Sequence, residues 1–174
     1  MAMREKTKKL TVSAMLAALG VVLLYLGSLV DVLDISMAAV VSLCAVFAVI
    51  EYGGAWPWLI YLVTGLLSLL LLPNRSPAVL YLLFFGYYPI LKEKLERRSR
   101  VVSWVLKELV FQLALALMLA IGHFFLNMSE GAEPLYYYAS FALIAEIAFP
   151  VYDIALTRLI TLYLVQLRKR LRLK

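Results

Sequence analysis

Long apolar stretches separated by short polar segments dominate the chain, and their lengths predict membrane-spanning helices. About 20 apolar residues cross a bilayer core of ~30 Å. The resulting fold class is an all-α integral membrane protein, a compact bundle of six transmembrane helices forming a single domain over residues 1–174. The expected helices cover residues 10–30, 35–50, 55–72, 78–91, 101–126 and 135–167.

A break at Glu51-Tyr52-Gly53-Gly54 separates the second and third stretches. Two consecutive glycines favour a tight turn between antiparallel helices. An alternative topology with four spans joins these two stretches into one helix and leaves the fourth stretch at the membrane surface. It would place the break in lipid, where backbone groups lack hydrogen-bond partners. The six-span topology is therefore favoured.

The basic residues predict the orientation of the bundle. The chain has 17 Lys and Arg residues, and most of them lie in three clusters that flank apolar stretches. Such clusters are retained on the cytoplasmic side of a membrane. We therefore expect both termini and the loop at 92–100 to be cytoplasmic. The clusters are Arg4, Lys6, Lys8 and Lys9; Lys92, Lys94, Arg97, Arg98 and Arg100; and Arg168, Lys169, Arg170, Arg172 and Lys174.

Composition supports the membrane interpretation and narrows the partners. Hydrophobic residues make up 64% of the chain, against roughly 45–50% in soluble domains, and the mean hydropathy is +0.91. The net charge of +6 could suggest nucleic acid, but the basic residues flank apolar spans. Anionic membrane lipids are the expected counter-charge, and nucleic acid is not an expected partner.

Ionisable residues inside the last two stretches are candidates for structure or function, because charges in a bilayer usually face the bundle interior and have partners. Spacing predicts ion pairs of Glu108 with Arg158 and of Lys107 with Asp153. These pairs would lock the two helices together, and a proton or cation relay is the alternative.

Glu146 lies near the expected bilayer midplane, four residues before the helix-breaking Pro150. Pro150 leaves the carbonyl of Glu146 without its helical partner. The carboxyl group of Glu146 is then either a ligand contact or a protonated group hydrogen-bonded inside the bundle. Tyr138 lies on the same helical stripe, and His123 and Asn127 end a comparable stripe on the preceding helix. An interfacial aromatic belt is the other explanation for the tyrosines at the start of the last helix.

Catalytic and metal-binding motifs are absent from the sequence. It contains no H-E-x-x-H, G-x-S-x-G or Walker motif. A single His and the single Cys44 offer no thiolate or imidazole cluster for a metal. We therefore expect no catalytic residue, no metal and no cofactor, and a protein that is not an enzyme.

Small residues near the start of the first helix suggest a packing face. Ala14 and Ala18 are one turn apart, an arrangement that lets another helix approach closely. They lie in the segment Lys8-Lys9-Leu10-Thr11-Val12-Ser13-Ala14-Met15-Leu16-Ala17-Ala18-Leu19-Gly20. This segment resembles the opening of the S components of energy-coupling factor (ECF) transporters, small bacterial membrane proteins that capture vitamins and related micronutrients.

The resemblance extends to chain length, six-span layout and cytoplasmic termini. It implies a substrate-capture subunit in the bacterial cytoplasmic membrane, whose Ala14 and Ala18 face a transmembrane scaffold subunit coupled to two ATPases. A small-molecule substrate would be held near the outer face. The positions that match this site are Asn74, Arg75, Tyr81, His123, Asn127, Tyr138 and Glu146.

Two other classes remain open at this point. One is a non-transporting membrane scaffold resembling the S-component fold, as in cell-shape or wall-synthesis complexes, which would bind no small molecule. The other is a small lipid-modifying enzyme with Glu146 or Asp153 as its acid or base.

Overall fold

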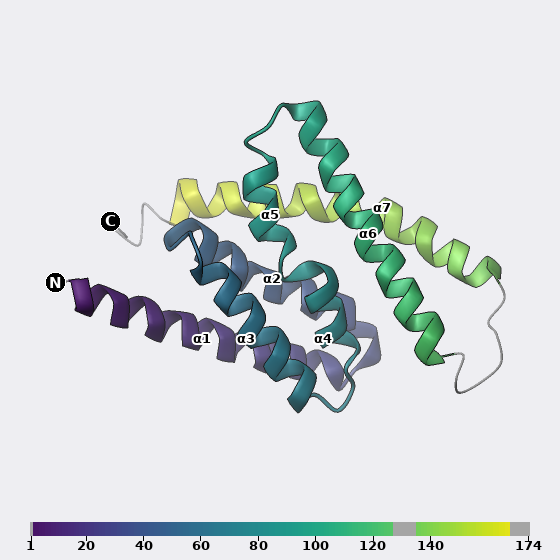
Figure 1. Ribbon diagram of the computed structural model, residues 1–174, viewed down its shortest axis with the longest axis horizontal. Helices are drawn as coiled ribbons and strands as arrows, with labels where there is room; N and C mark the ends of the chain where they lie inside the picture. Colours follow the sequence, from purple (N-terminus) through teal and green to yellow (C-terminus); the bar gives the residue numbers. More distant parts are fainter. Residues whose placement is uncertain (1, 127–134, 168–174) are drawn as a thin grey trace. The chain divides into compact units, whose positions relative to one another are not determined.

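Helices make up nearly all of the structure, a computed structural model that describes residues 2–126 and 135–167. Within these residues no strand is present, so the all-α fold class is confirmed. The α-helices are α1 (Ala2–Ser28), α2 (Asp34–Glu51), α3 (Trp56–Leu71), α4 (Ser76–Leu80), α5 (Tyr88–Leu95), α6 (Arg100–Leu126) and α7 (Leu135–Leu162) (Figure 1). A 3₁₀ turn at Asp31–Leu33 precedes α2, and π-helical turns occupy Tyr81–Phe85 and Tyr163–Leu167.

Four segments are long and apolar enough to cross a membrane: Glu5–Ser28, Asp34–Glu51, Arg100–Gly122 and Ala139–Val165. The shorter α3 is apolar as well, with 16 residues. The expected fourth helix at 78–91 is instead α4, a π-helical turn and α5 in succession. These helices are compatible with a membrane protein. The six crossings and the cytoplasmic termini stay predictions.

The chain forms two compact units, residues 1–114 and 115–174. The first unit contains α1 to α5 and the first half of α6. In the second unit, α7 has Pro150 in its interior and buries Phe149, Asp153 and Leu156. Thr157 and Thr161 donate hydrogen bonds from their hydroxyl groups to the backbone carbonyls of Asp153 and Thr157, respectively.

The turn between α2 and α3 is built on two glycines in the left-handed region. Gly53 and Gly54 both have φ of +59°, which other residues adopt only at a cost. The backbone N–H groups of Tyr52 and Gly53 both donate to the carbonyl oxygen of Ala48, at 3.0 Å. These bonds end α2, so the alternative that joins the second and third stretches into one helix is wrong.

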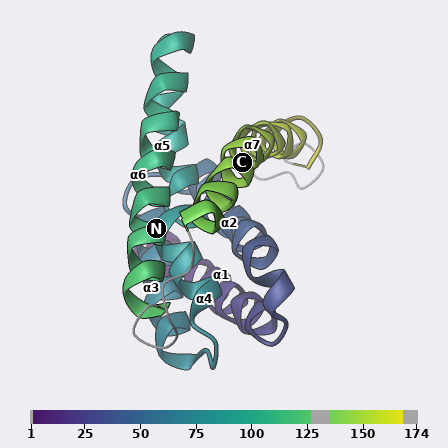
Figure 2. The ribbon, with the colours of Figure 1, turned by 90° about the vertical axis from the view of Figure 1, so that its right-hand side faces the viewer.

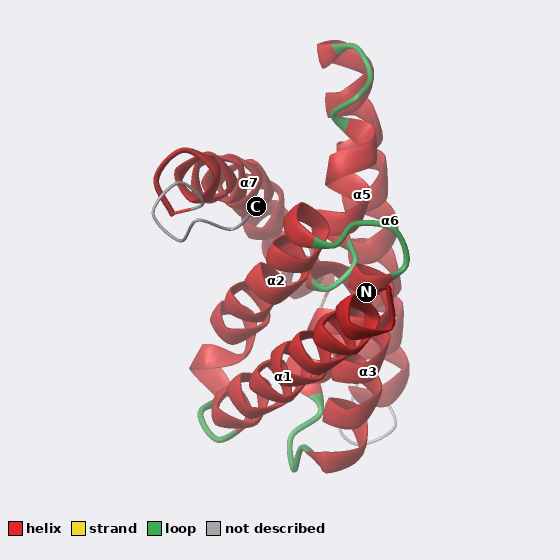
Figure 3. Cartoon of the chain, turned by 90° about the vertical axis from the view of Figure 1, so that its left-hand side faces the viewer, coloured by secondary structure: helices red, strands yellow, loops and turns green. Residues whose placement is uncertain are grey.

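In the first unit, α1, α2 and α3 pack side by side (Figure 3), and α4 lies beside α1 and α2 (Figure 2). Leu24, Val41 and Tyr81 are fully buried at the centre. A Cβ atom on Gly20 would lie 2.8 Å from Cγ2 of Thr64. The absence of a side chain at residue 20 therefore allows α1 and α3 to approach closely.

The π-helical turn at Tyr81–Phe85 is fastened to α3. The backbone N–H of Gly86 donates to the carbonyl oxygen of Tyr81 at 2.8 Å, five residues back. The hydroxyl group of Tyr61 on α3 donates to the carbonyl oxygen of Leu82 at 2.8 Å. A side chain outside the turn thus satisfies a backbone group of the irregular helix, as buried carbonyls require.

Candidate functional site

A buried cluster of charged residues joins α5 to α6. Glu96 follows α5, and its Oε1 atom accepts from Nζ of Lys92 at 3.0 Å and from Nζ of Lys107 at 2.7 Å. Lys92 and Lys107 are 1% and 4% exposed, whereas the Glu96 side chain is 41% exposed. One carboxylate oxygen therefore connects a lysine at the end of α5 with a lysine inside α6.

Electrostatics keep the Glu96 carboxyl group ionised. Burial raises the pKa of Glu96, but hydrogen bonds from Lys107 and Lys92 outweigh that effect and hold the pKa below its ordinary value of 4.5. Charge-assisted bonds of this kind are stronger than neutral ones. The Lys107 ammonium group also lies 5.7 Å from the ring centroid of Trp104, within cation–π range. Glu96 is therefore charged at neutral pH and holds the two helices together.

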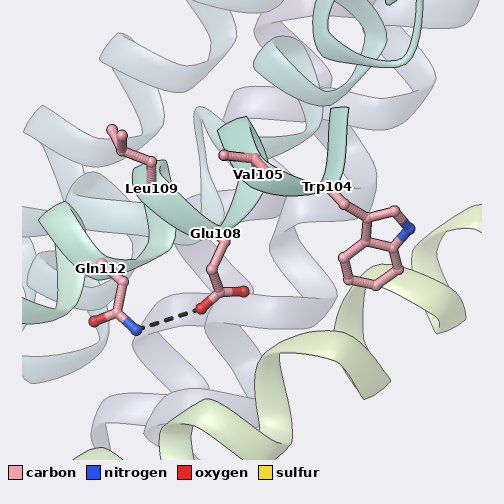
Figure 4. A pocket seen from close by; sticks show the side chains of 5 residues that line it. All are labelled: Trp104, Val105, Glu108, Leu109 and Gln112. Carbon is pink, nitrogen blue, oxygen red and sulfur yellow. Dashed lines mark hydrogen bonds between the residues drawn. The ribbon is translucent and has the colours of Figure 1, made fainter. Parts of the chain in front are cut away.

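Next to this cluster, one face of α6 borders a shallow, wide-open pocket of about 540 Å³. Its lining residues are Trp104, Val105, Glu108, Leu109 and Gln112 (Figure 4). Nε2 of Gln112 donates to Oε1 of Glu108 at 3.3 Å. The lining thus combines apolar side chains with one carboxylate–amide pair, but the pocket is too open to enclose a ligand.

The predicted ion-pair residues have different environments. Lys107 and Asp153 are buried, Glu108 is half-buried and Arg158 is exposed. The contact of Lys107 with Glu96 was missed, although the spacing of Lys92 and Glu96, four residues apart, could have indicated part of the cluster. The predicted pairs of Lys107 with Asp153 and of Glu108 with Arg158 would each connect one unit with the other, and they stay predictions.

Three predicted substrate residues lie in the segment from the end of α3 to the start of the π-helical turn. Oδ1 of Asn74 accepts a hydrogen bond from the backbone N–H of Ser76, the first residue of α4, at 3.0 Å. Arg75 is exposed, while Tyr81 is fully buried with its ring centroid 5.9 Å from that of Tyr61. In this structure Asn74 supports the turn, Tyr81 belongs to the core, and Arg75 is accessible to a ligand.

The other predicted substrate residues lie in or next to the second unit. Glu146 is exposed on α7. His123 lies in α6 and Tyr138 in α7, but their side chains fall outside the part of the chain that the structure describes. Asn127 also lies outside the described residues. The proposed role of these four residues therefore still rests on the resemblance.

The predicted partner face on α1 is accessible. Ala14 and Ala18 are exposed, whereas Ser13, Ala17 and Gly20 are buried. A set of buried hydroxyl groups on the inner side of the same unit was not predicted from the sequence. Oγ of Ser13, Oγ1 of Thr64 and Oγ of Ser68 are buried and have no hydrogen-bond partner among the described residues.

The described residues contain no group of three or more His, Cys, Asp or Glu side chains placed to hold a metal ion. Comparison with known proteins adds no identity: no family model, no curated protein and no solved structure matches this chain.

Proposed function

We propose that this chain is the substrate-capture membrane subunit of an ECF-type uptake transporter for a small micronutrient, a vitamin or a related compound, in a bacterial cytoplasmic membrane. The observation that carries the proposal is the accessibility of Ala14 and Ala18 on α1, within the segment that resembles S components. Two small residues one turn apart on an exposed face let a partner helix approach closely.

The inner side of α1 packs within the chain, whereas its outer side is free to contact a partner. Its inner side is occupied, because Leu24 is fully buried and Gly20 closely approaches Thr64 of α3. On its outer side the alanines alternate with large apolar residues, Met15 at 66% exposure and Leu19 at 50%. In a bilayer such a surface contacts lipid or a second membrane protein. The proposed partners are a transmembrane scaffold subunit and two ATPases, which would supply the energy that no ATP-binding motif in this sequence provides.

The proposed capture face lies at the opposite membrane side from the basic clusters. Arg75 is the one basic residue that the six-span topology places outside, and its side chain is exposed. A guanidinium group in this position suits an anionic group of a micronutrient, such as a carboxylate or phosphate. Glu146, which is expected near the midplane from its position in the last apolar stretch, is the second proposed substrate contact.

Replacing Ala14 and Ala18 together with leucine tests the proposed coupling face. We expect the double variant to lose co-purification with the co-expressed scaffold and ATPase subunits, because each added isobutyl group prevents close helix contact. Binding of the micronutrient to the isolated subunit should persist. The measurement is the amount of scaffold subunit retained on tagged chain in mild detergent, with uptake measured in the same cells.

A matched control is leucine at Ala139 and Ala148, two exposed alanines of α7. This variant adds the same volume to the chain and should retain the complex. Unchanged complex formation and uptake in the Ala14/Ala18 variant would refute the proposed role of this face.

A further inference from the structure

Exposed basic side chains gather at the turn between α5 and α6, where Lys94, Arg98 and Arg100 are all exposed. The acidic residues of the same turn are already engaged. Glu93 pairs with Arg97, and Glu96 bridges Lys92 and Lys107. Within the part of the chain that the structure describes, no ion pair involves Lys94, Arg98 or Arg100. Three positive charges therefore face outward without a carboxylate from the turn.

The Glu96 bridge fixes the position of these charges. It connects the last turn of α5 to the second turn of α6, and the intervening segment is only residues 96–99. The backbone N–H of Arg98 also donates to the carbonyl oxygen of Leu95 at 3.1 Å. A short, braced turn presents its cations with little loss of conformational freedom on binding, which favours association.

Directly beyond the turn, the exposed surface of α6 becomes apolar, and it includes a tryptophan in its first turns. Trp104 is 40% exposed, and Val101, Val105, Leu109 and Leu113 form an outward stripe with four-residue spacing and exposures of 59–75%. At a rise of ~1.5 Å per residue, Leu113 lies about 20 Å beyond Arg100. Cations at the turn, followed by an apolar stripe with an amphipathic indole near its start, follow the order of a bilayer from headgroups to core.

We propose that the α5–α6 turn is a binding site for anionic phospholipid, in which Lys94, Arg98 and Arg100 contact the headgroup phosphate while Trp104 lies at the level of the interface. An acidic soluble protein would complement the cations but would not account for the apolar stripe that continues up α6 from the same turn. The proposal requires the membrane placement of α6 and is independent of transport.

Depth-dependent fluorescence quenching tests the site on the full chain in nanodiscs. With Trp56 and Trp58 replaced by phenylalanine, Trp104 is the remaining tryptophan. The nanodiscs contain unlabelled phosphatidylcholine with a minor fraction of brominated lipid, either phosphatidylglycerol or phosphatidylcholine. We expect brominated phosphatidylglycerol to quench Trp104 at least twofold more strongly, because the anionic lipid is enriched at the turn.

Two variants that lose the same number of positive charges distinguish a specific lipid site from general electrostatic attraction between the protein and anionic lipid. Replacing Lys94, Arg98 and Arg100 with glutamine should abolish the preference, whereas glutamine at Lys6, Lys8 and Lys9 should leave it intact. Because the three residues of the turn are exposed, the melting temperature of their glutamine variant should stay close to that of the parent chain. A variant with Lys94→Arg, Arg98→Lys and Arg100→Lys keeps the charges and should keep the preference.

Several outcomes would overturn the proposal. One is equal quenching by the two brominated lipids, and another is equal loss of preference in both glutamine variants. A third is removal of the preference by millimolar inorganic phosphate, which would identify a soluble-anion site instead of a lipid site. Binding of an acidic protein that displaces phosphatidylglycerol from the turn would likewise assign the surface to a protein partner.

Discussion

Replacing Gly86 with alanine should lower the melting temperature of the protein in detergent by several degrees. A Cβ atom at this position would lie 2.8 Å from Cζ of Tyr81 and still closer to the ring of Tyr61. Neither ring has room to move, because Tyr81 is fully buried and the Tyr61 hydroxyl group is bonded to the carbonyl oxygen of Leu82. Overpacking of this kind costs about 1–3 kcal/mol of unfolding free energy.

Helix propensity acts in the opposite direction, which makes the substitution informative. Gly86 has helical φ and ψ of −76° and −42°, so alanine by itself would be favoured by roughly 0.5–1 kcal/mol. Gly122→Ala is the matched control, because a Cβ atom on Gly122 in α6 meets no atom of the described residues within 4 Å. We expect this control to be neutral or slightly stabilising. Similar melting temperatures for the two variants would show that the contact between α3 and the π-helical turn is wrong.

Replacing Glu96 with glutamine should destabilise the protein at neutral pH by about 1–3 kcal/mol. This cost is smaller than the cost of breaking a fully buried ion pair, because the Glu96 side chain is 41% exposed. The amide keeps the shape of the side chain but removes the negative charge that Lys92 and Lys107 share. The control is Glu93→Gln, the same change at an exposed pair with Arg97, where we expect at most about 0.5 kcal/mol. Equal effects of the two substitutions would contradict a special role for the bridge.

The pH dependence gives an independent check on Glu96. Its pKa in the folded state lies below 4.5, so the unfolded chain takes up the proton first as the pH falls. The stability that Glu96 contributes is fully present above the unfolded-state pKa and is lost as the pH falls through the lower folded-state pKa. The difference in melting temperature between the parent chain and Glu96→Gln should therefore shrink below about pH 4.5.

Hydropathy alone located most helices because apolar stretches of the required length end at strong signals. Gly53 and Gly54 ended α2 where expected, since their positive φ angles require a turn. The stretch at 78–91 was different. Its apolar residues are continuous, but Leu82 faces Gly65 of α3 and Tyr61 bonds the Leu82 carbonyl. These are tertiary contacts that no local pattern encodes, and they accompany the π-helical turn and the separate α5.

The candidate site was likewise predictable only in part from the sequence. Ala14 and Ala18 are exposed on α1, and their role as a partner face stays a prediction. The partner of Lys107 was not found, because only the basic residues of the loop at 92–100 were considered in predicting the topology. Only the return of α6 beside α5 brings the Lys107 ammonium group to 2.7 Å from the Glu96 carboxylate. Such a pairing depends on how the helices cross, which composition and spacing leave undetermined.

Mass spectrometry of the small molecules that co-purify with the chain in mild detergent tests its proposed role as a capture subunit most directly. The account predicts one specific micronutrient-sized compound at near-equal molar amount, which Arg75→Ala or Glu146→Gln reduces while the variant stays folded. A chain that carries only phospholipid, and that co-purifies with cell-wall synthesis proteins instead, would contradict the account and favour a non-transporting scaffold.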